Sequence, residues 1–279
     1  QLKPMLIGMS NRGPDSAGFA IYRDPVKSGS IKLTLQTSDD DFAWKHVAHE
    51  LSEELGVEVE TEVRSSHAVM VVGAPLETVR NWMRHHHPEL RVVGIGECIE
   101  LFKEKGLPAD VAERFRLEEF SGSHAIGHTR MATESAITTE HSHPFSTGLD
   151  LCLVHNGSLS NHNRLREHLR RQDVAFETDN DSEVAAGFLA HRLSSGDSLE
   201  GALQAGLREL DGFFTFAVGT AQGFAVLRDA IACKPAVLAE TDRWVAMASE
   251  YRSLAHLPEA EHARIWEPAP ATVYGWSRN

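Results

Sequence analysis

The stretch between His124 and Asp181 constrains the fold most, because its apolar segments end on polar or charged residues. One apolar segment ends on Arg130, a second ends on Asn156-Gly157, and a helix opened by acidic residues follows. A rigid sheet holds such residues where the following loops leave them exposed. We therefore expect the functional site to lie at the ends of these strands.

The hydrophobic pattern of the whole chain predicts two sheets with helices outside them. Helical spacing predicts helices over 1–10, 44–55, 75–87, 161–172, 182–193 and 199–210. Short apolar or alternating runs predict strands over 17–22, 31–36, 57–63, 67–72, 213–219, 223–227, 236–239 and 244–248, with weaker ones near Ile265 and Val273. Residues 38 to about 118 would form a compact insertion of strands and helices within one domain, 1–279.

Charge and hydropathy exclude several classes of protein. The formal net charge of −13 argues against a nucleic-acid partner, because such binding depends on lysine and arginine neutralising phosphates. No apolar run approaches the length that spans a bilayer, and the first residues lack a signal-peptide pattern. Cys98, Cys152 and Cys233 form no CxxC pair. We expect a cytoplasmic protein with neither nucleic-acid nor membrane partners.

The run His85-His86-His87 suggests a metal site at first sight. Consecutive residues of a helix point in different directions, so these imidazoles cannot share one ion without irregular backbone. The sequence also places no cysteine or carboxylate at ligand spacing from them. We expect a solvated helix end and no metal site.

Five motifs in order resemble those of the class II glutamine amidotransferases, which belong to the N-terminal-nucleophile hydrolase superfamily. They are RGPDSAG at 12–18, HTRMAT at 128–133, HP at 143–144, HNG at 155–157 and DSE at 181–183. The resemblance covers nearly the whole chain. It implies an α+β fold, the four-layer αββα sandwich of N-terminal-nucleophile hydrolases, here with the inserted α/β segment.

Longer runs resemble one subgroup, the amidotransferase-like subunit of N-methylglutamate synthase and related glutamate-synthase-like complexes. These runs cover 122–135, 142–148 and 156–163. The resemblance implies a subunit that hydrolyses the glutamine amide and supplies ammonia to a synthase acting on glutamate and methylamine. FMN and any iron–sulfur cluster would belong to glutamate-synthase-like partner subunits, because this chain has neither a cysteine-rich motif nor a nucleotide-binding glycine loop.

The resemblance also implies roles for five residues. Arg130 would bind the α-carboxylate of glutamine, since a planar guanidinium grips a carboxylate bidentately. Asp181 would bind the α-ammonium group, and Thr133 would line the pocket. Asn156 and the backbone N–H of Gly157 would form an oxyanion hole for the tetrahedral intermediate.

Each of these residues also has a purely structural interpretation. Arg130 could form a surface ion pair, and Asn156-Gly157 is a common tight-turn dipeptide. Asp181 could simply begin a helix, where the macrodipole favours an acid. His143 would only shape its loop.

The sequence departs from the family pattern at the nucleophile. The family uses an N-terminal cysteine whose own α-amine is the base, and the chain begins with Gln1. Cys152 and Cys233 lie within or beside predicted buried strands, so neither is expected to replace it. Glu134 and Met131 stand where many members carry histidine and tryptophan.

Two functions therefore remain open. In the first, the native chain extends before Gln1 and begins with the nucleophilic cysteine, so that the subunit hydrolyses glutamine. In the second, the chain is a catalytically silent scaffold subunit of the same complex. The helical face at 1–10 begins abruptly, which favours the first.

Overall fold

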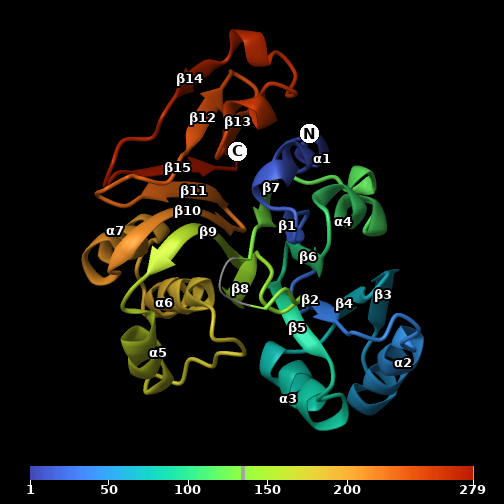
Figure 1. The fold of residues 1–279 in the computed structure, drawn as a ribbon. Helices are drawn as coiled ribbons and strands as arrows, with labels where there is room; N and C mark the ends of the chain where they lie inside the picture. The colour runs from blue at the N-terminus through green and yellow to red at the C-terminus, as the bar shows by residue number, and fades with distance from the viewer. Residues whose placement is uncertain (133–135, 279) are drawn as a thin grey trace.

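The computed structural model describes residues 1–132 and 136–278, and it shows an α+β fold of four layers (Figure 1). The first sheet has the order β6-β1-β7 and consists of β1 (Ser16–Tyr22), β6 (Ile99–Lys105) and β7 (His124–Arg130). The second sheet has the order β15-β11-β10-β9-β8. Its strands are β8 (Phe145–Gly148), β9 (Leu151–Leu159), β10 (Gly212–Thr220), β11 (Gly223–Arg228) and β15 (Val273–Ser277).

Helices cover the outer face of each sheet. The helices α5 (His162–Arg170), α6 (Asp181–Ser194) and α7 (Leu199–Glu209) lie on the second sheet, as Figure 1 shows on the left. The helices α1 (Leu2–Gly8) and α4 (Pro108–Arg114), with the short 3-10 turns η1 (Ser10–Arg12) and η2 (Leu117–Glu119), lie on the first sheet. The expected αββα sandwich is thereby confirmed.

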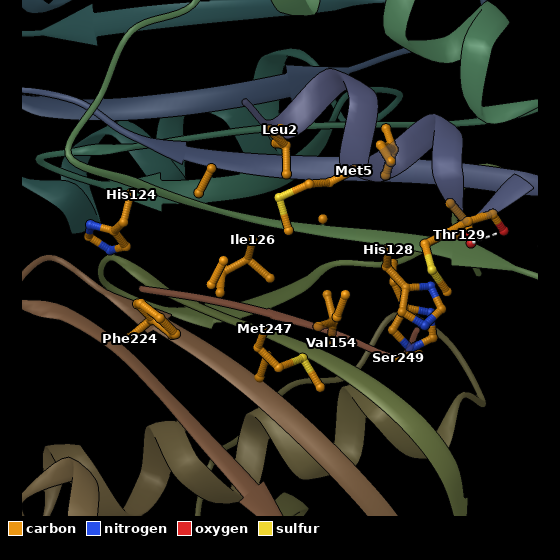
Figure 2. A pocket seen from close by; sticks show the side chains of 18 of the residues that line it. Leu2, Met5, His124, Ile126, His128, Thr129, Val154, Phe224, Met247 and Ser249 are labelled. Carbon is orange, nitrogen blue, oxygen red and sulfur yellow. Dashed lines mark hydrogen bonds between the residues drawn. The ribbon is translucent and has the colours of Figure 1, made fainter. Parts of the chain in front are cut away.

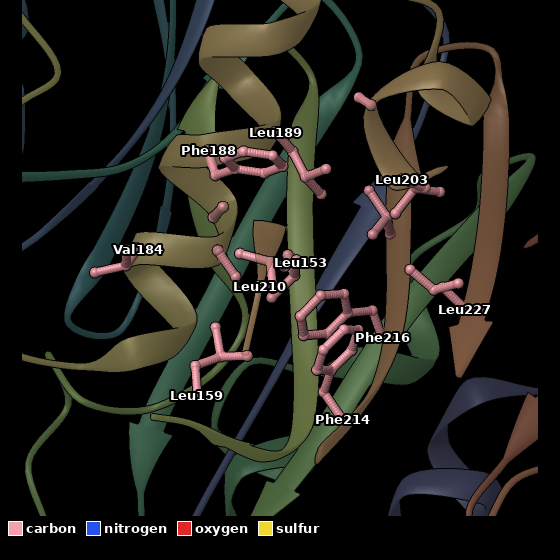
Figure 3. Close-up of a cluster of buried hydrophobic side chains, with 14 of the residues drawn as sticks. Leu153, Leu159, Val184, Phe188, Leu189, Leu203, Leu210, Phe214, Phe216 and Leu227 are labelled. Carbon is pink, nitrogen blue, oxygen red and sulfur yellow. The ribbon is translucent and has the colours of Figure 1, made fainter. Parts of the chain in front are cut away.

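Two apolar cores hold the second sheet in place. Beneath the helices, Phe214 and Phe216 stack with ring centroids 4.5 Å apart, and Leu153 and Phe188 pack near them (Figure 3). Between the sheets, a second core contains Ala20, Tyr22, Ile126, Cys152, Val154, Ala217 and Val226. Because β9 contributes alternate side chains to both cores, it is fixed from two sides.

The inserted unit is a separate sheet with its own core. This inserted sheet has the order β3-β4-β2-β5 and consists of β2 (Ile31–Gln36), β3 (Val59–Arg64), β4 (His67–Val72) and β5 (Arg91–Gly96). The helices α2 (Trp44–Leu55) and α3 (Leu76–His86) cover it, and Gly56 ends α2 in the left-handed conformation. The inserted sheet spans 31–96, whereas β6 and α4, at 99–114, belong to the first sheet and its helix layer.

A small sheet lies between β11 and the last strand, β15, in the sequence. It has the order β13-β12-β14 and consists of β12 (Val237–Glu240), β13 (Val245–Ala248) and β14 (Arg264–Trp266), with α8 (Tyr251–Leu254) and η3 (Ala260–His262) beside it. The strands predicted near 236–239, 244–248, Ile265 and Val273 are therefore confirmed. In the described part of the chain, no helix is long and apolar enough to cross a bilayer.

The histidine run at the end of α3 has carboxylate neighbours in the folded structure. Nε2 of His87 lies 3.0 Å from Oε2 of Glu50, and Nε2 of His86 lies 3.4 Å from Glu54. Both acids come from α2, so sequence spacing could not show them. Among the described residues, no group of three or more histidine, cysteine or acidic side chains is arranged to hold a metal ion.

Candidate active site

One large groove, with a volume of about 1880 Å³, lies along the whole of β7 and along residues 154–158 of β9. Figure 2 shows it between Leu2 and Met5 of α1 on one side and Val154 and Met247 on the other. Four of the five predicted site residues line this groove: Arg130, Asn156, Gly157 and Asp181. The fifth, Thr133, lies outside the described residues. The fold therefore brings these four residues to one groove.

Arg130 is the last residue of β7 and is 8% exposed. Its Nη1 donates to the carbonyl of Ala136 at 3.3 Å. Burial lowers the pKa of the guanidinium, and the charge of Asp15 opposes this shift. Asp15 also binds the backbone on both sides of the strand end, because its N–H donates to the carbonyl of Arg130 at 3.0 Å and its Oδ2 accepts from Ala132 N at 2.8 Å. The 12–18 motif thus supports the position of Arg130.

Asp181 is the first residue of α6 and also lines the groove. Asn180 caps this helix, since its Oδ1 accepts from the N–H of Ser182 at 2.8 Å. Oδ2 of Asp181 accepts from the N–H of Leu159 at 2.9 Å. Burial alone would raise the pKa of this carboxyl, but its interactions with His155, Leu159 and Ser182 outweigh burial and lower the pKa. Asp181 therefore carries a partly buried negative charge.

Asn156 and Gly157 lie inside β9, opposite Thr215 and Phe214 of β10. The prediction that the strand ends on this pair, with a tight turn, was wrong, because β9 continues to Leu159. Gly157 has φ +150°, and a Cβ there would collide with a backbone carbonyl of β10. The absence of a side chain lets the strand stay paired while its backbone borders the groove.

A cluster of three histidines and one serine lines part of the groove: the half-buried His128 and the buried His143, His155 and Ser182. The rings of His128 and His143 stack with centroids 4.2 Å apart. Ser182 Oγ lies 2.8 Å from Nε2 of His143 and 3.0 Å from Nδ1 of His155. Burial lowers the pKa of His128 to about 4 and lowers that of His143 well below its ordinary value. Both rings are therefore neutral at neutral pH.

Sequence reasoning assigned no function to His128, His155 or Ser182, and it left His143 as a loop residue. One pattern in the sequence could have indicated the cluster. Three of the five motifs begin with a histidine, namely HTRMAT at 128–133, HP at 143–144 and HNG at 155–157. The serine follows Asp181 directly. Their convergence, however, depends on the packing of β7, β9 and α6.

Two cysteines, Cys152 and Cys233, were considered as replacements for the nucleophile, and neither lines the groove. Cys152 is completely buried between the sheets, where burial raises the pKa of its thiol to about 12. Cys233 is exposed in the loop between β11 and β12. Neither belongs to the described residues that line the groove.

Comparison with known proteins places the chain in a family. Residues 128–256 match a family described as a glutamine amidotransferase domain. The chain is 54% identical over 276 residues to the glutamine amidotransferase-like protein GlxB of Rhizobium meliloti, covering 99% of this chain and 91% of that protein. The chain belongs to the class II glutamine amidotransferase family. It is also 32% identical to a putative glutamine amidotransferase of Methanothermobacter thermautotrophicus, covering 97% and 92% of the two chains.

A solved structure supports the fold of this amidotransferase family member. The glutamine phosphoribosylpyrophosphate amidotransferase of B. subtilis superposes with a TM-score of 0.60 at 18% identity. The match covers 99% of this chain and 46% of that one. Because the identity is low, this likeness shows the shared fold of the amidotransferase domain alone.

Proposed function

We propose that this chain binds glutamine and hydrolyses its side-chain amide to supply ammonia within a larger synthase. The observation that carries the proposal is the groove itself, because Arg130, Asp181 and the Asn156-Gly157 pair all line it. A free amino acid presents one carboxylate and one ammonium group, and these two side chains have the complementary charges. A desolvated pair of this kind recognises an amino-acid backbone.

In this mechanism the substrate amide lies against Asn156 and Gly157. Attack on the amide carbon creates a negative charge on the carbonyl oxygen, and the Asn156 side-chain amide and the Gly157 N–H donate hydrogen bonds to it. Collapse of the tetrahedral intermediate, with the proton taken from the nucleophile passing to the amide nitrogen, releases ammonia and leaves an acyl-enzyme, and water then releases glutamate and restores the nucleophile. We propose that the nucleophile is an N-terminal cysteine carried ahead of Gln1 in the native chain, because the family chemistry uses such a residue.

We further propose that the chain serves an N-methylglutamate-synthase-like or other glutamate-synthase-like complex in the cytoplasm. Ammonia released into water is protonated and lost, so a docked synthase would protect it. The runs at 122–135, 142–148 and 156–163 support this choice of complex. One partner subunit would bind FMN, and an interface above about 1,000 Å² is expected for a stable complex.

The decisive experiment uses protein purified from its native host. Intact mass and N-terminal peptide analysis should show residues before Gln1 beginning with cysteine, and the protein should convert glutamine to glutamate and ammonia. A native protein without this cysteine and without glutaminase activity would contradict the proposal and favour the scaffold function. Native mass spectrometry of the same preparation should show the partner subunits, whereas a monomer performing the whole synthesis alone would exclude them.

A further inference from the structure

Ser182 is buried beside the proposed ammonium-binding residue and has three polar neighbours. It is the second residue of α6 and is 1% exposed. Its Oγ lies 2.8 Å from Nε2 of His143, 3.0 Å from Nδ1 of His155 and 3.3 Å from Oδ1 of Asp181. These groups come from the loop before β8, from β9 and from α6. One hydroxyl thus connects three separate segments at the groove.

The hydroxyl of Ser182 has only one proton for these three contacts. A serine oxygen can donate once and accept twice. Ionised Asp181 can only accept, so the serine proton must go to Asp181 if all three contacts are hydrogen bonds. The two imidazoles must then donate to the serine oxygen, which makes His143 the Nε2–H tautomer and His155 the Nδ1–H tautomer.

The nitrogens without partners agree with this arrangement. His128 donates through Nε2 to the carbonyl of His155 at 3.1 Å, which leaves its Nδ1 without a proton when the ring is neutral. Among the described residues, the buried ring nitrogens of this cluster that lack a partner are Nδ1 of His128, Nδ1 of His143 and Nε2 of His155. These are the three nitrogens that carry no proton in the derived tautomers. The arrangement therefore leaves no buried N–H of the three rings without an acceptor.

We propose that Ser182 is a positioning residue that orients the Asp181 carboxylate toward the α-ammonium group of the substrate. The inference rests on the proposed role of Asp181 in binding glutamine. The Leu159 N–H fixes Oδ2 at 2.9 Å, and the Ser182 hydroxyl fixes Oδ1. Two imidazole N–H groups occupy both lone pairs of the serine oxygen, so the serine O–H can point only toward Oδ1 of Asp181. The carboxylate is held at both oxygens before the substrate arrives.

Titration calorimetry on the full-length protein tests this inference with two ligands. L-Glutamine carries the α-ammonium group, and glutaramate is the same molecule without it. Ser182→Ala should weaken binding of L-glutamine about tenfold and change glutaramate binding less than twofold. Ser182→Thr, which keeps the hydroxyl, should restore most of the affinity for L-glutamine. Equal weakening of both ligands, or no weakening of either, would overturn the inference.

Two further variants separate this inference from the proposed function. Ser194→Ala removes an exposed hydroxyl of the same helix, one that donates to the His191 carbonyl, and it should leave both affinities unchanged. Asp181→Asn should itself weaken L-glutamine more than glutaramate. If Asp181→Asn has no effect, the proposed role of Asp181 fails and the inference fails with it. If Asp181→Asn weakens L-glutamine and Ser182→Ala does not, only the inference fails.

A direct measurement of tautomers does not depend on substrate. Long-range proton–nitrogen NMR correlation of the histidine side chains should show His143 protonated at Nε2 and His155 protonated at Nδ1 in the free protein. In Ser182→Ala these two signals should shift or broaden, because both N–H groups lose their acceptor. The opposite tautomer at either ring in the unmodified protein would contradict the derived proton positions.

Discussion

The two halves of β9 lie on one strand and pair with the same neighbour, but their surroundings differ. The first half, 151–154, is completely apolar and packs between the helix layer and the first sheet, and of its residues Val154 alone also lines the groove. The second half, 155–158, is polar and borders the groove. The backbone pairing with β10 is continuous through both halves. The buried apolar half therefore fixes the position of the strand, and the strand in turn positions the polar residues 155–158 at the groove.

The two halves also differ in how their polar atoms are satisfied. Side chains such as Leu153 and Val154 bury no polar atom, so their burial contributes to stability directly. His155 is also buried but leaves Nε2 without a partner. A buried acceptor without a partner costs free energy. The unpartnered nitrogen of His155 therefore lowers the stability of the fold, and the burial of the apolar side chains in the first half offsets this loss.

The largest effect on stability should come from the apolar half. Leu153→Ala removes a completely buried side chain and should lower the free energy of unfolding by about 2–5 kcal/mol, because the cavity cannot fully collapse. Urea unfolding measures this change. The folded fraction should still bind glutamine with unchanged affinity. A selective loss of affinity with unchanged stability would break the distinction between the two halves.

The next effect concerns binding at the groove. Arg130→Lys should weaken glutamine binding by about 1.5–3 kcal/mol, because lysine cannot form the bidentate contact in a desolvated site. Titration calorimetry measures the affinity, and thermal unfolding should show that the fold survives. Arg192→Lys is the matched control, since Arg192 forms exposed ion pairs with Asp197 and Glu209. An unchanged affinity in Arg130→Lys would remove this residue from the site.

The histidine cluster should make stability depend on pH. The pKa of His128 is lowered to about 4 by burial, so below about pH 6.5 the unfolded chain binds a proton that the folded chain does not. Stability should be fully present above this pH and should fall as the pH drops toward 4, by up to about 1.4 kcal/mol per pH unit for this ring. His128→Phe should reduce the slope of urea stability against pH. An identical slope would contradict the assignment.

The smallest effect is expected at Cys233, an exposed residue outside β9. Cys233→Ser alters an exposed loop residue and should change the free energy of unfolding by less than about 0.5 kcal/mol. In the native protein, iodoacetamide should modify Cys233 and spare Cys152, whose thiol pKa is raised to about 12 by burial. Mass spectrometry of the peptides distinguishes the two. Rapid modification of Cys152 would show that the core around β9 opens.

The sequence could predict the elements that have strong periodicity. The helices beginning near Asp181 and Leu199 were predicted because apolar residues recur there at helical spacing, and the structure shows that Asn180 and Ser198 cap them. The strand β8 was missed, because its four residues pair irregularly with β9 and show no alternation. The true end of β9 was missed because Gly157 tolerates a backbone conformation that lets the strand continue.

The candidate site residues were predicted from the family motifs and not from strand ends alone. Arg130, Asn156 and Asp181 were predicted in this way, and all three line the groove. Ser182 lies 39 positions after His143 and 27 positions after His155. No periodicity in the sequence relates residues at these separations. Such contacts follow from tertiary packing. The roles of these residues in binding glutamine stay predictions until the variants are measured.

The inserted sheet has a consequence for how the chain assembles its site. Tyr22 of β1 pairs with Ile99 of β6, so a long loop must close before the first sheet can form. Loop closure costs entropy that grows with loop length. The inserted sheet shortens this loop, because Lys32 and Gly96 at its two ends are direct partners in the β2–β5 pairing. When the inserted sheet has folded on its own core, the chain segments that connect it to β1 and β6 lie next to each other. The inserted sheet then acts as the turn of a large hairpin formed by β1 and β6.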